Sequence, residues 1–192
     1  SARASARRVK SGMTMRGNRV GHDFKGKRVL VMGLGLHGGG VGSVRFLARR
    51  GARVTVTDLR AKTVLAPSLA KLKDIKGVAY VLGRHRERDF LKSDLIVKNP
   101  GVPPTSPYLL LARKRKIPVT TDMGIFFREC PARIIGITGT RGKSTCAWLI
   151  YKFLKTKYRR VFLGQNNRKS VLEFLKDLKQ DDLIVLELSS FQ

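Results

Sequence analysis

A glycine-rich segment that ends in a lysine and two hydroxyl residues is the part of this sequence best suited to chemistry. An apolar run at residues 134–137 leads into Thr138-Gly139-Thr140-Arg141-Gly142-Lys143-Ser144-Thr145. Such a turn directs backbone N–H groups and a helix N-terminus toward one point, where they can hold phosphate. Lys143 would add charge for the outer phosphates, and Ser144 or Thr145 could bind Mg²⁺. We therefore predict a nucleotide-phosphate site at residues 139–145.

The strict phosphate-loop pattern is missed, because Gly136 lies one residue too far upstream. A glycine-rich turn that merely joins a strand to a helix is the alternative. Glu187 stands at the end of the apolar strand predicted at residues 182–188. In phosphate-loop folds an acid at this place commonly holds Mg²⁺, directly or through water. Lys143 and Glu187 are the candidate catalytic residues, although Glu187 could also be an exposed acid at a strand end.

A second glycine motif precedes this one. A strand predicted at residues 28–32 runs into a Gly-x-Gly-x-x-Gly turn that starts at Gly33, followed by a helix at 41–50, which Gly51 ends. The next strand, at 53–57, leads to Asp58. This order is typical of a dinucleotide-type βαβ unit. Phosphate could lie on the turn with Asp58 on a ribose, as in nicotinamide-dependent enzymes, or the same frame could hold another nucleotide.

Strands and helices continue to alternate. We predict a helix at 67–75, a strand at 78–82, a charged surface connection at 84–89, a strand at 94–98, a helix at 108–116 and a strand at 117–120. Asn99-Pro100-Gly101 follows the strand at 94–98, at an edge where open α/β sheets bind ligands, although a plain turn is equally compatible.

The residues after Asp122 start a second unit. A helix from Lys143 carries Cys146, Leu149, Ile150, Phe153 and Leu154 on one apolar face, with Cys146 buried and Trp148 off that face. A strand at 161–163 and an amphipathic helix at 171–178 precede the strand with Glu187. Three strands are too few for a nucleotide-binding sheet of ordinary size, so we expect this unit to be incomplete.

These patterns predict an α/β fold in three parts: a disordered basic arm at residues 1–23, a Rossmann-like parallel-sheet domain at 24–121, and the start of a phosphate-loop ATPase-type domain at 122–192. The formal charge of +27 favours polyanionic partners, but charge alone predicts only non-specific nucleic-acid binding. Two cysteines without metal-ligand spacing, no long apolar run and no secretory signal predict a cytoplasmic protein without a membrane span. A monomer is expected.

The motifs together resemble a known family. The phosphate loop and the later string Glu187-Leu188-Ser189-Ser190-Phe191-Gln192 are similar to the Mur ligases of peptidoglycan synthesis. The string is most similar to the branch whose substrates are UDP-N-acetylmuramoyl-L-alanine and D-glutamate. The resemblance extends from about Lys25 to Gln192, and it implies an ATP- and Mg²⁺-dependent ligase that works through an acyl phosphate.

The resemblance also implies roles for single residues. Lys143 would contact the ATP phosphates, and Ser144 or Thr145 would hold Mg²⁺ together with Glu187. The UDP pocket would contain Gly35, Leu36, His37, Asp58 and Arg60, with Asn99 and Gly101 near the pyrophosphate. The muramoyl part would face Asn166, Ser189 and Gln192.

This sequence departs from the family pattern at two of these places. Arg141 replaces the usual Asn of the phosphate loop, and His37 replaces a small hydroxyl residue. The family's catalytic His and carbamylated Lys lie beyond Gln192, so we do not expect these 192 residues alone to complete a reaction.

Two other classes remain open. A nicotinamide-binding regulatory or redox domain would explain residues 33–58, but not the second phosphate loop or Glu187. A nucleic-acid-binding protein would explain the charge, but the sequence carries no RNA- or DNA-binding motif and its aromatic residues do not cluster with the basic ones.

Overall fold

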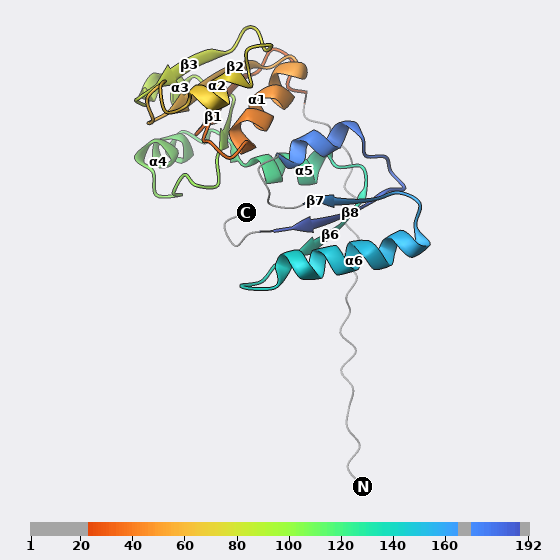
Figure 1. The fold of residues 1–192 in the computed structure, drawn as a ribbon. Helices are drawn as coiled ribbons and strands as arrows, with labels where there is room; N and C mark the ends of the chain where they lie inside the picture. The colour runs from red at the N-terminus through yellow and green to blue at the C-terminus, as the bar shows by residue number, and fades with distance from the viewer. Residues whose placement is uncertain (1–22, 165–169, 189–192) are drawn as a thin grey trace.

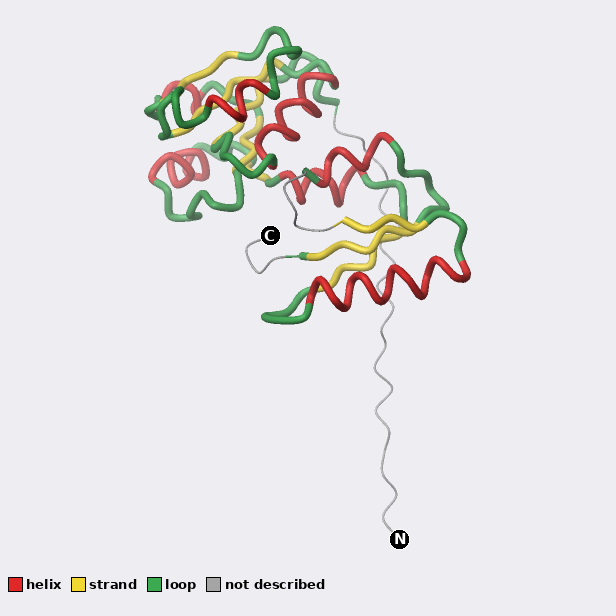
Figure 2. Tube along the Cα trace, viewed as in Figure 1, coloured by secondary structure: helices red, strands yellow, loops and turns green. Residues whose placement is uncertain are grey.

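The computed structural model describes residues 23–164 and 170–188, which form two α/β units, each built on a parallel sheet (Figure 1). The residues of the predicted basic arm before Asp23 lie outside the described residues, as do Asn166, Ser189 and Gln192. Figure 2 shows the strands of each unit gathered in one layer with helices packed against them. The predicted α/β class is confirmed.

The first unit is a five-stranded parallel sheet with the order β3-β2-β1-β4-β5. The order reverses between β1 and β4, so the carboxyl ends of these two strands border the crevice in which doubly wound sheets bind ligands. The elements are β1 (Arg28–Met32), α1 (Gly39–Arg49), β2 (Arg53–Asp58), α2 (Ala66–Ala70), β3 (Ala79–Leu82), α3 (Glu87–Leu91), β4 (Leu95–Lys98), α4 (Pro107–Lys114) and β5 (Val119–Thr120).

The second unit has three parallel strands in the order β6-β8-β7. β8 lies in the middle, so the last described strand stands directly beside the strand that enters the phosphate loop. The elements are α5 (Asp122–Glu129), β6 (Arg133–Ile137), α6 (Lys143–Lys157), β7 (Val161–Gly164), the 3₁₀ helix η1 (Val171–Lys176) and β8 (Leu183–Glu187).

The two sheets share one hydrophobic core through α1, α5 and η1. Figure 1 shows α1 and α5 between the two sheets, while α6 covers the other face of the second sheet. The shared core contains Leu47 of α1, Phe126 of α5, Leu172 of η1 and Ile184 of β8. At Gly42 the contact is so close that an added Cβ would lie 2.1 Å from the Cβ of Ser170, the residue before η1. The two units therefore pack closely where Gly42 of α1, which has no side chain, meets Ser170.

The apolar residues of α6 are divided between a buried and an exposed face. Ala147, Ile150 and Leu154 pack against β6, β7 and β8, as predicted for Ile150 and Leu154. The predicted burial of Cys146 is wrong, since its side chain is exposed, and Phe153 is 73% exposed. Apolar residues surround most of this helix, so periodicity could not identify the stripe centred on Ala147 as the one that meets the sheet.

Several predicted elements differ in type or length. Residues 171–176 form a 3₁₀ helix instead of an amphipathic helix to 178, and the helix predicted at 67–75 is reduced to α2. The charged connection at 84–89 contains the start of α3, a helix that periodicity could not predict because only Phe90 of it is buried. Helix α5 was also missed, and its N-cap Thr121 accepts a hydrogen bond from the Gly124 N–H at 3.0 Å.

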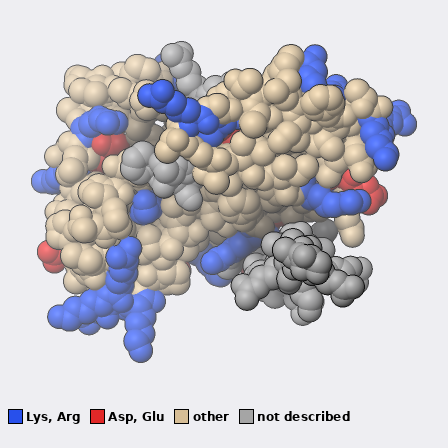
Figure 3. All heavy atoms as spheres, turned by 90° about the horizontal axis from the view of Figure 1, so that it is seen from below, with Lys and Arg blue, Asp and Glu red and all other residues tan. Residues whose placement is uncertain are grey.

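The high positive charge is distributed over the surface. On the face in Figure 3, Lys and Arg form several separate groups and Asp and Glu are few. Among the described residues, no helix is long and apolar enough to cross a membrane.

An ion pair between neighbouring strands should make stability depend on pH. The guanidinium and backbone N–H of Arg28 donate to Asp94, and they lower the pKa of that carboxyl from 3.8 to about 2. A lowered pKa stabilises the fold above the unfolded value, and this contribution is lost as the pH falls from about 4 toward 2. We therefore expect Asp94→Asn to lower the urea midpoint at about pH 6, and the gap to wild type to narrow by about pH 3.

The pair is largely exposed, so its absolute effect is modest. Asp181→Asn, which removes one exposed carboxylate elsewhere, is the control for the change in net charge. A gap that stays constant over this pH range would contradict the role given to Asp94.

Candidate nucleotide-binding sites

The turn between β1 and α1 is shaped by glycines that tolerate no side chain. Gly33 has a left-handed φ of +90°, and a Cβ there would lie 2.9 Å from the Cβ of Asn99. A Cβ at Gly40 would lie 2.3 Å from the carbonyl oxygen of Leu34. The N-cap of α1 is Gly38, which has no side chain to occupy the helix's first N–H groups. The turn thus presents backbone donors of the kind that hold phosphate.

Asp58 fastens this turn to the end of β2. Its Oδ2 accepts a hydrogen bond from the Gly35 N–H at 3.1 Å, and its Oδ1 accepts one from the Arg60 N–H at 2.9 Å. The residue is only 6% exposed. Because both carboxylate oxygens bind backbone amides, Asp58 fixes the positions of two loops that face the same space.

That space is a cavity of about 540 Å³ at the carboxyl ends of β1, β2 and β4. Five of the residues predicted for the UDP pocket line it: Gly35, Asp58, Arg60, Asn99 and Gly101. Asn99 shapes its own turn, since its Oδ1 accepts from the Gly101 N–H at 3.1 Å. Leu36 and His37 are exposed and do not line the cavity.

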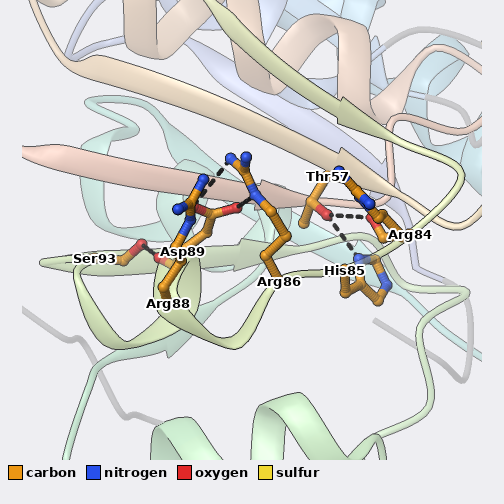
Figure 4. A network of polar contacts seen from close by, with 7 residues as sticks. All are labelled: Thr57, Arg84, His85, Arg86, Arg88, Asp89 and Ser93. Carbon is orange, nitrogen blue, oxygen red and sulfur yellow. Dashed lines mark hydrogen bonds and ion pairs between the residues drawn. The ribbon is translucent and has the colours of Figure 1, made fainter.

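His85 also lines this cavity, although the sequence predicted a solvated surface at 84–89. Figure 4 shows its ring turned toward Thr57, with the Nδ1 atom 2.7 Å from Thr57 Oγ1. The ring packs edge-on against Phe90 and Tyr108. Partial burial lowers the pKa of His85, and the negative charge of Asp58 opposes this effect only in part.

The prediction for residue 85 is wrong for a topological reason. Strand β3 pairs with β2, so the residue that follows β3 arrives at the same sheet edge as Asp58. The signal that could have revealed it is the position after a predicted strand, which was used for Asn99 but not here. The nearby residues Arg86 and Asp89 do form a surface pair, at 2.7 Å (Figure 4).

The second candidate site lies where β6 enters α6. Gly139 and Gly142 both have positive φ, and Gly142 is the N-cap of α6. The Lys143 ammonium turns back over the loop and donates to the carbonyl oxygen of Gly139 at 2.9 Å. Thr140, Arg141 and Thr145 are exposed. The loop thus places a positive charge beside a helix N-terminus, a combination suited to polyphosphate.

Glu187 is brought to this loop by strand pairing. It stands opposite Ile137 in the parallel register of β8 and β6, and the Ser144 hydroxyl donates to its Oε2 at 3.0 Å. One hydroxyl and one carboxylate are hard oxygen ligands that suit Mg²⁺ bound also by nucleotide phosphates. Among the described residues, no group of three or more His, Cys, Asp or Glu side chains could hold a metal ion.

Comparisons with known proteins identify the family of this chain. Residues 27–121 match the family described as "Mur ligase MurD-like, N-terminal domain". Over 166 residues, or 86% of this chain, the sequence is 48% identical to the UDP-N-acetylmuramoylalanine–D-glutamate ligase of Roseiflexus sp. strain RS-1. The chain belongs to the Mur ligase family. It is also 44% identical over 171 residues to the enzyme of the same name from Borreliella burgdorferi strain ZS7.

The chain spans only about a third of the length of these relatives, 35% and 37% respectively. The matched residues make up 86% and 88% of this chain. A solved murein peptide ligase from Psychrobacter arcticus superposes on 87% of this chain and 39% of its own, with a TM-score of 0.52 and 13% identity. At that identity the likeness supports the Mur ligase fold alone.

Proposed function

We propose that this chain supplies the UDP-binding and ATP-phosphate-binding parts of a ligase that joins D-glutamate to UDP-N-acetylmuramoyl-L-alanine. The observation that carries the proposal is the grouping of Lys143, Ser144 and Glu187 at the ends of β6 and β8. The proposed substrates are inferred from the names of the two relatives, which are 48% and 44% identical to this chain.

The proposed reaction has two steps. The substrate carboxylate attacks the γ-phosphorus of ATP, so that ADP leaves and an acyl phosphate forms. The amine of D-glutamate then attacks the acyl carbon, and phosphate leaves with the electron pair of the broken C–O bond. A carboxylate is a poor electrophile, and phosphorylation provides its leaving group.

The residues of this chain would contribute positioning and charge compensation more than covalent chemistry. Lys143 would move from its bond with Gly139 onto the phosphates, where a charge-assisted hydrogen bond is stronger. The residues that would hold Mg²⁺ are Ser144 or Thr145 and Glu187, and the ion would neutralise the charge of the transferred phosphoryl group. Arg141 would add a second positive charge beside the loop.

The first cavity would take the UDP part. Gly35, Asp58 and Arg60 would line it, with Asn99 and Gly101 near the pyrophosphate. Leu36 and His37, which lie outside the lining of the cavity, stay predicted contacts of the UDP part. Asn166, Ser189 and Gln192, outside the described residues, stay predicted contacts of the muramoyl part. The division at about residue 121 into UDP-binding and ATP-binding domains, and a monomeric state in the cytoplasm, also remain predictions.

The proposal can be tested by titrating UDP-N-acetylmuramoyl-L-alanine into the protein by calorimetry, with NAD⁺ as the competitor. We expect the UDP compound to bind, and we expect free UDP, but not NAD⁺, to compete with it. Displacement by NAD⁺ would favour the nicotinamide-binding alternative. In a protein of the relatives' full length, ADP release should require both the UDP compound and D-glutamate, and release without either of them would contradict the ligase.

RNA binding is the test of the nucleic-acid alternative. We expect any binding to weaken steeply with salt and to show no sequence preference, because surface charge alone causes it. A sequence preference that persists at high salt would contradict this expectation.

A further inference from the structure

Helix α1 carries the contact of the first unit with the second. It packs against α5 and η1, and apolar side chains of all three join one core (Figure 1). Polar contacts with α5 hold both ends of α1. At the first turn, Asp122 Oδ2 lies 3.5 Å from the place that a Cβ of Gly39 would take. At the other end, the guanidinium of the C-cap Arg50 reaches the carboxylate of Glu129 at 3.4 Å.

The closest contact lies between these two ends. Gly42 is buried in α1, and a Cβ there would stand 2.1 Å from the Cβ of Ser170 and 2.8 Å from its Oγ. Carbon atoms in contact lie about 3.5–4.0 Å apart, so a methyl group would require the two segments to separate by more than about 1 Å. Glycine inside a helix is less stable than alanine. Residue 42 thus gives up helix stability where it permits a close approach of the two units.

Ser170 is fixed in its place. It is 2% exposed, its Oγ accepts from the Leu172 N–H at 3.3 Å, and its carbonyl oxygen accepts from the Glu173 N–H at 3.1 Å. The hydroxyl also forms a hydrogen bond with Asp122. Burial raises the pKa of the Asp122 carboxyl, and hydrogen bonds with Met123 and Ser170 oppose this rise only in part. A methyl group at residue 42 would therefore displace α1 from η1, because Ser170 alone cannot turn aside.

The separation of the two units matters because each candidate nucleotide site belongs to one of them. The residues that line the UDP cavity lie between Met32 and Tyr108, in the first unit. Lys143 and Glu187 stand in the second. In the proposed reaction, a carboxylate held by the first unit attacks the γ-phosphorus of a nucleotide held by the second. A misplacement of about 1 Å can lower such a rate by about 100-fold.

We propose that Gly42 is a positioning residue, whose contact with Ser170 sets the separation of the two units at which the substrate carboxylate meets the γ-phosphate of ATP. This inference rests on the proposed function. Asp122 and the pair of Arg50 and Glu129 hold the two ends of α1 at the same separation. Gly42 does not line the UDP cavity, and the phosphate loop belongs to another helix. Binding and turnover should therefore respond differently to a change at residue 42.

The test measures nucleotide affinities and ADP release in a protein of the relatives' full length. We expect Gly42→Ala to lower kcat by about tenfold or more, and the affinities for UDP-N-acetylmuramoyl-L-alanine and ATP to stay within about twofold of wild type. The reason is that each site moves as a whole with its own unit. Equal losses of both affinities would show a merely structural role and would overturn the inference.

Ser170→Gly provides the rescue. Without the serine side chain, the Cα of residue 170 is the nearest atom to the added methyl group, at 3.4 Å. We expect the double variant, Gly42→Ala with Ser170→Gly, to regain the kcat of Ser170→Gly alone. That single variant is the reference, because it has also lost the serine hydroxyl. A double variant as slow as Gly42→Ala would contradict the proposed contact.

A second position keeps the inference falsifiable if Gly42→Ala folds poorly. Asp122→Ala adds no volume but removes the bond that fastens Ser170, whereas Asp122→Asn keeps a polar partner for it. We expect kcat to fall in Asp122→Ala, with both nucleotides still bound, and to recover in Asp122→Asn. A wild-type kcat in Gly42→Ala, or in Asp122→Ala, would overturn the inference alone. If wild type releases no ADP when both substrates are present, the proposed function fails and the inference fails with it.

Discussion

Replacing Lys143 with alanine should weaken ATP binding by roughly 10- to 100-fold, the loss expected for a charge-assisted contact with phosphate. The side chain is already held over the loop by its bond to the Gly139 carbonyl, 2.9 Å away. Its charge is thus placed beside the helix N-terminus before a nucleotide arrives. The measurement is the affinity for ATP with Mg²⁺, and in a protein of the relatives' full length ADP release should be abolished.

Lys152→Ala is a matched control for Lys143→Ala. Lys152 stands on the same helix, with its ammonium 5.3 Å from the centre of the Trp148 ring, and its removal changes the net charge by the same amount. Equal weakening by both variants would attribute the effect to the general field of this basic protein. Normal turnover in Lys143→Ala would contradict the assignment of residues 139–145 as the phosphate loop.

Replacing Asp58 with alanine should weaken UDP-substrate binding by more than about tenfold, because two part-buried hydrogen bonds to backbone N–H groups are lost. Those groups, at Gly35 and Arg60, shape the two loops that line the cavity. Asp58 ends β2 in the first sheet, whereas the phosphate loop follows β6 in the second sheet, so we expect ATP affinity to stay nearly unchanged. Calorimetry with each nucleotide separately measures both effects.

Two outcomes would change the interpretation of Asp58. Equal loss of UDP and ATP affinity would indicate a structural role in the fold as a whole. Asp94→Asn is the control, because Asp94 pairs with Arg28 at the amino end of the same sheet, away from the cavity. A comparable loss of UDP affinity in that variant would show that sheet stability, not the cavity, limits binding.

The sequence alone was sufficient for the features that depend on local pattern. The glycine turns at Gly33 and Gly142, the strand ends at Asp58 and Glu187, and the alternation of strands and helices are all readable along the chain. Each depends on backbone sterics or on a hydrophobic period that a few neighbouring residues express. The resemblance to the Mur ligases, carried by residues 138–145 and 187–192, was confirmed by the comparisons.

Only the tertiary structure decided which residues meet across the fold. Strand pairing placed Glu187 against Ser144, and the order β3-β2-β1 brought His85 to the cavity beside Asp58. Packing against the second sheet likewise determined which face of α6 is buried, and Cys146 lies on the exposed face. These contacts join residues tens of positions apart, and a local period carries no information about them. The sequence determined the chemistry that this protein carries, and the packing of its two sheets determined which groups act together.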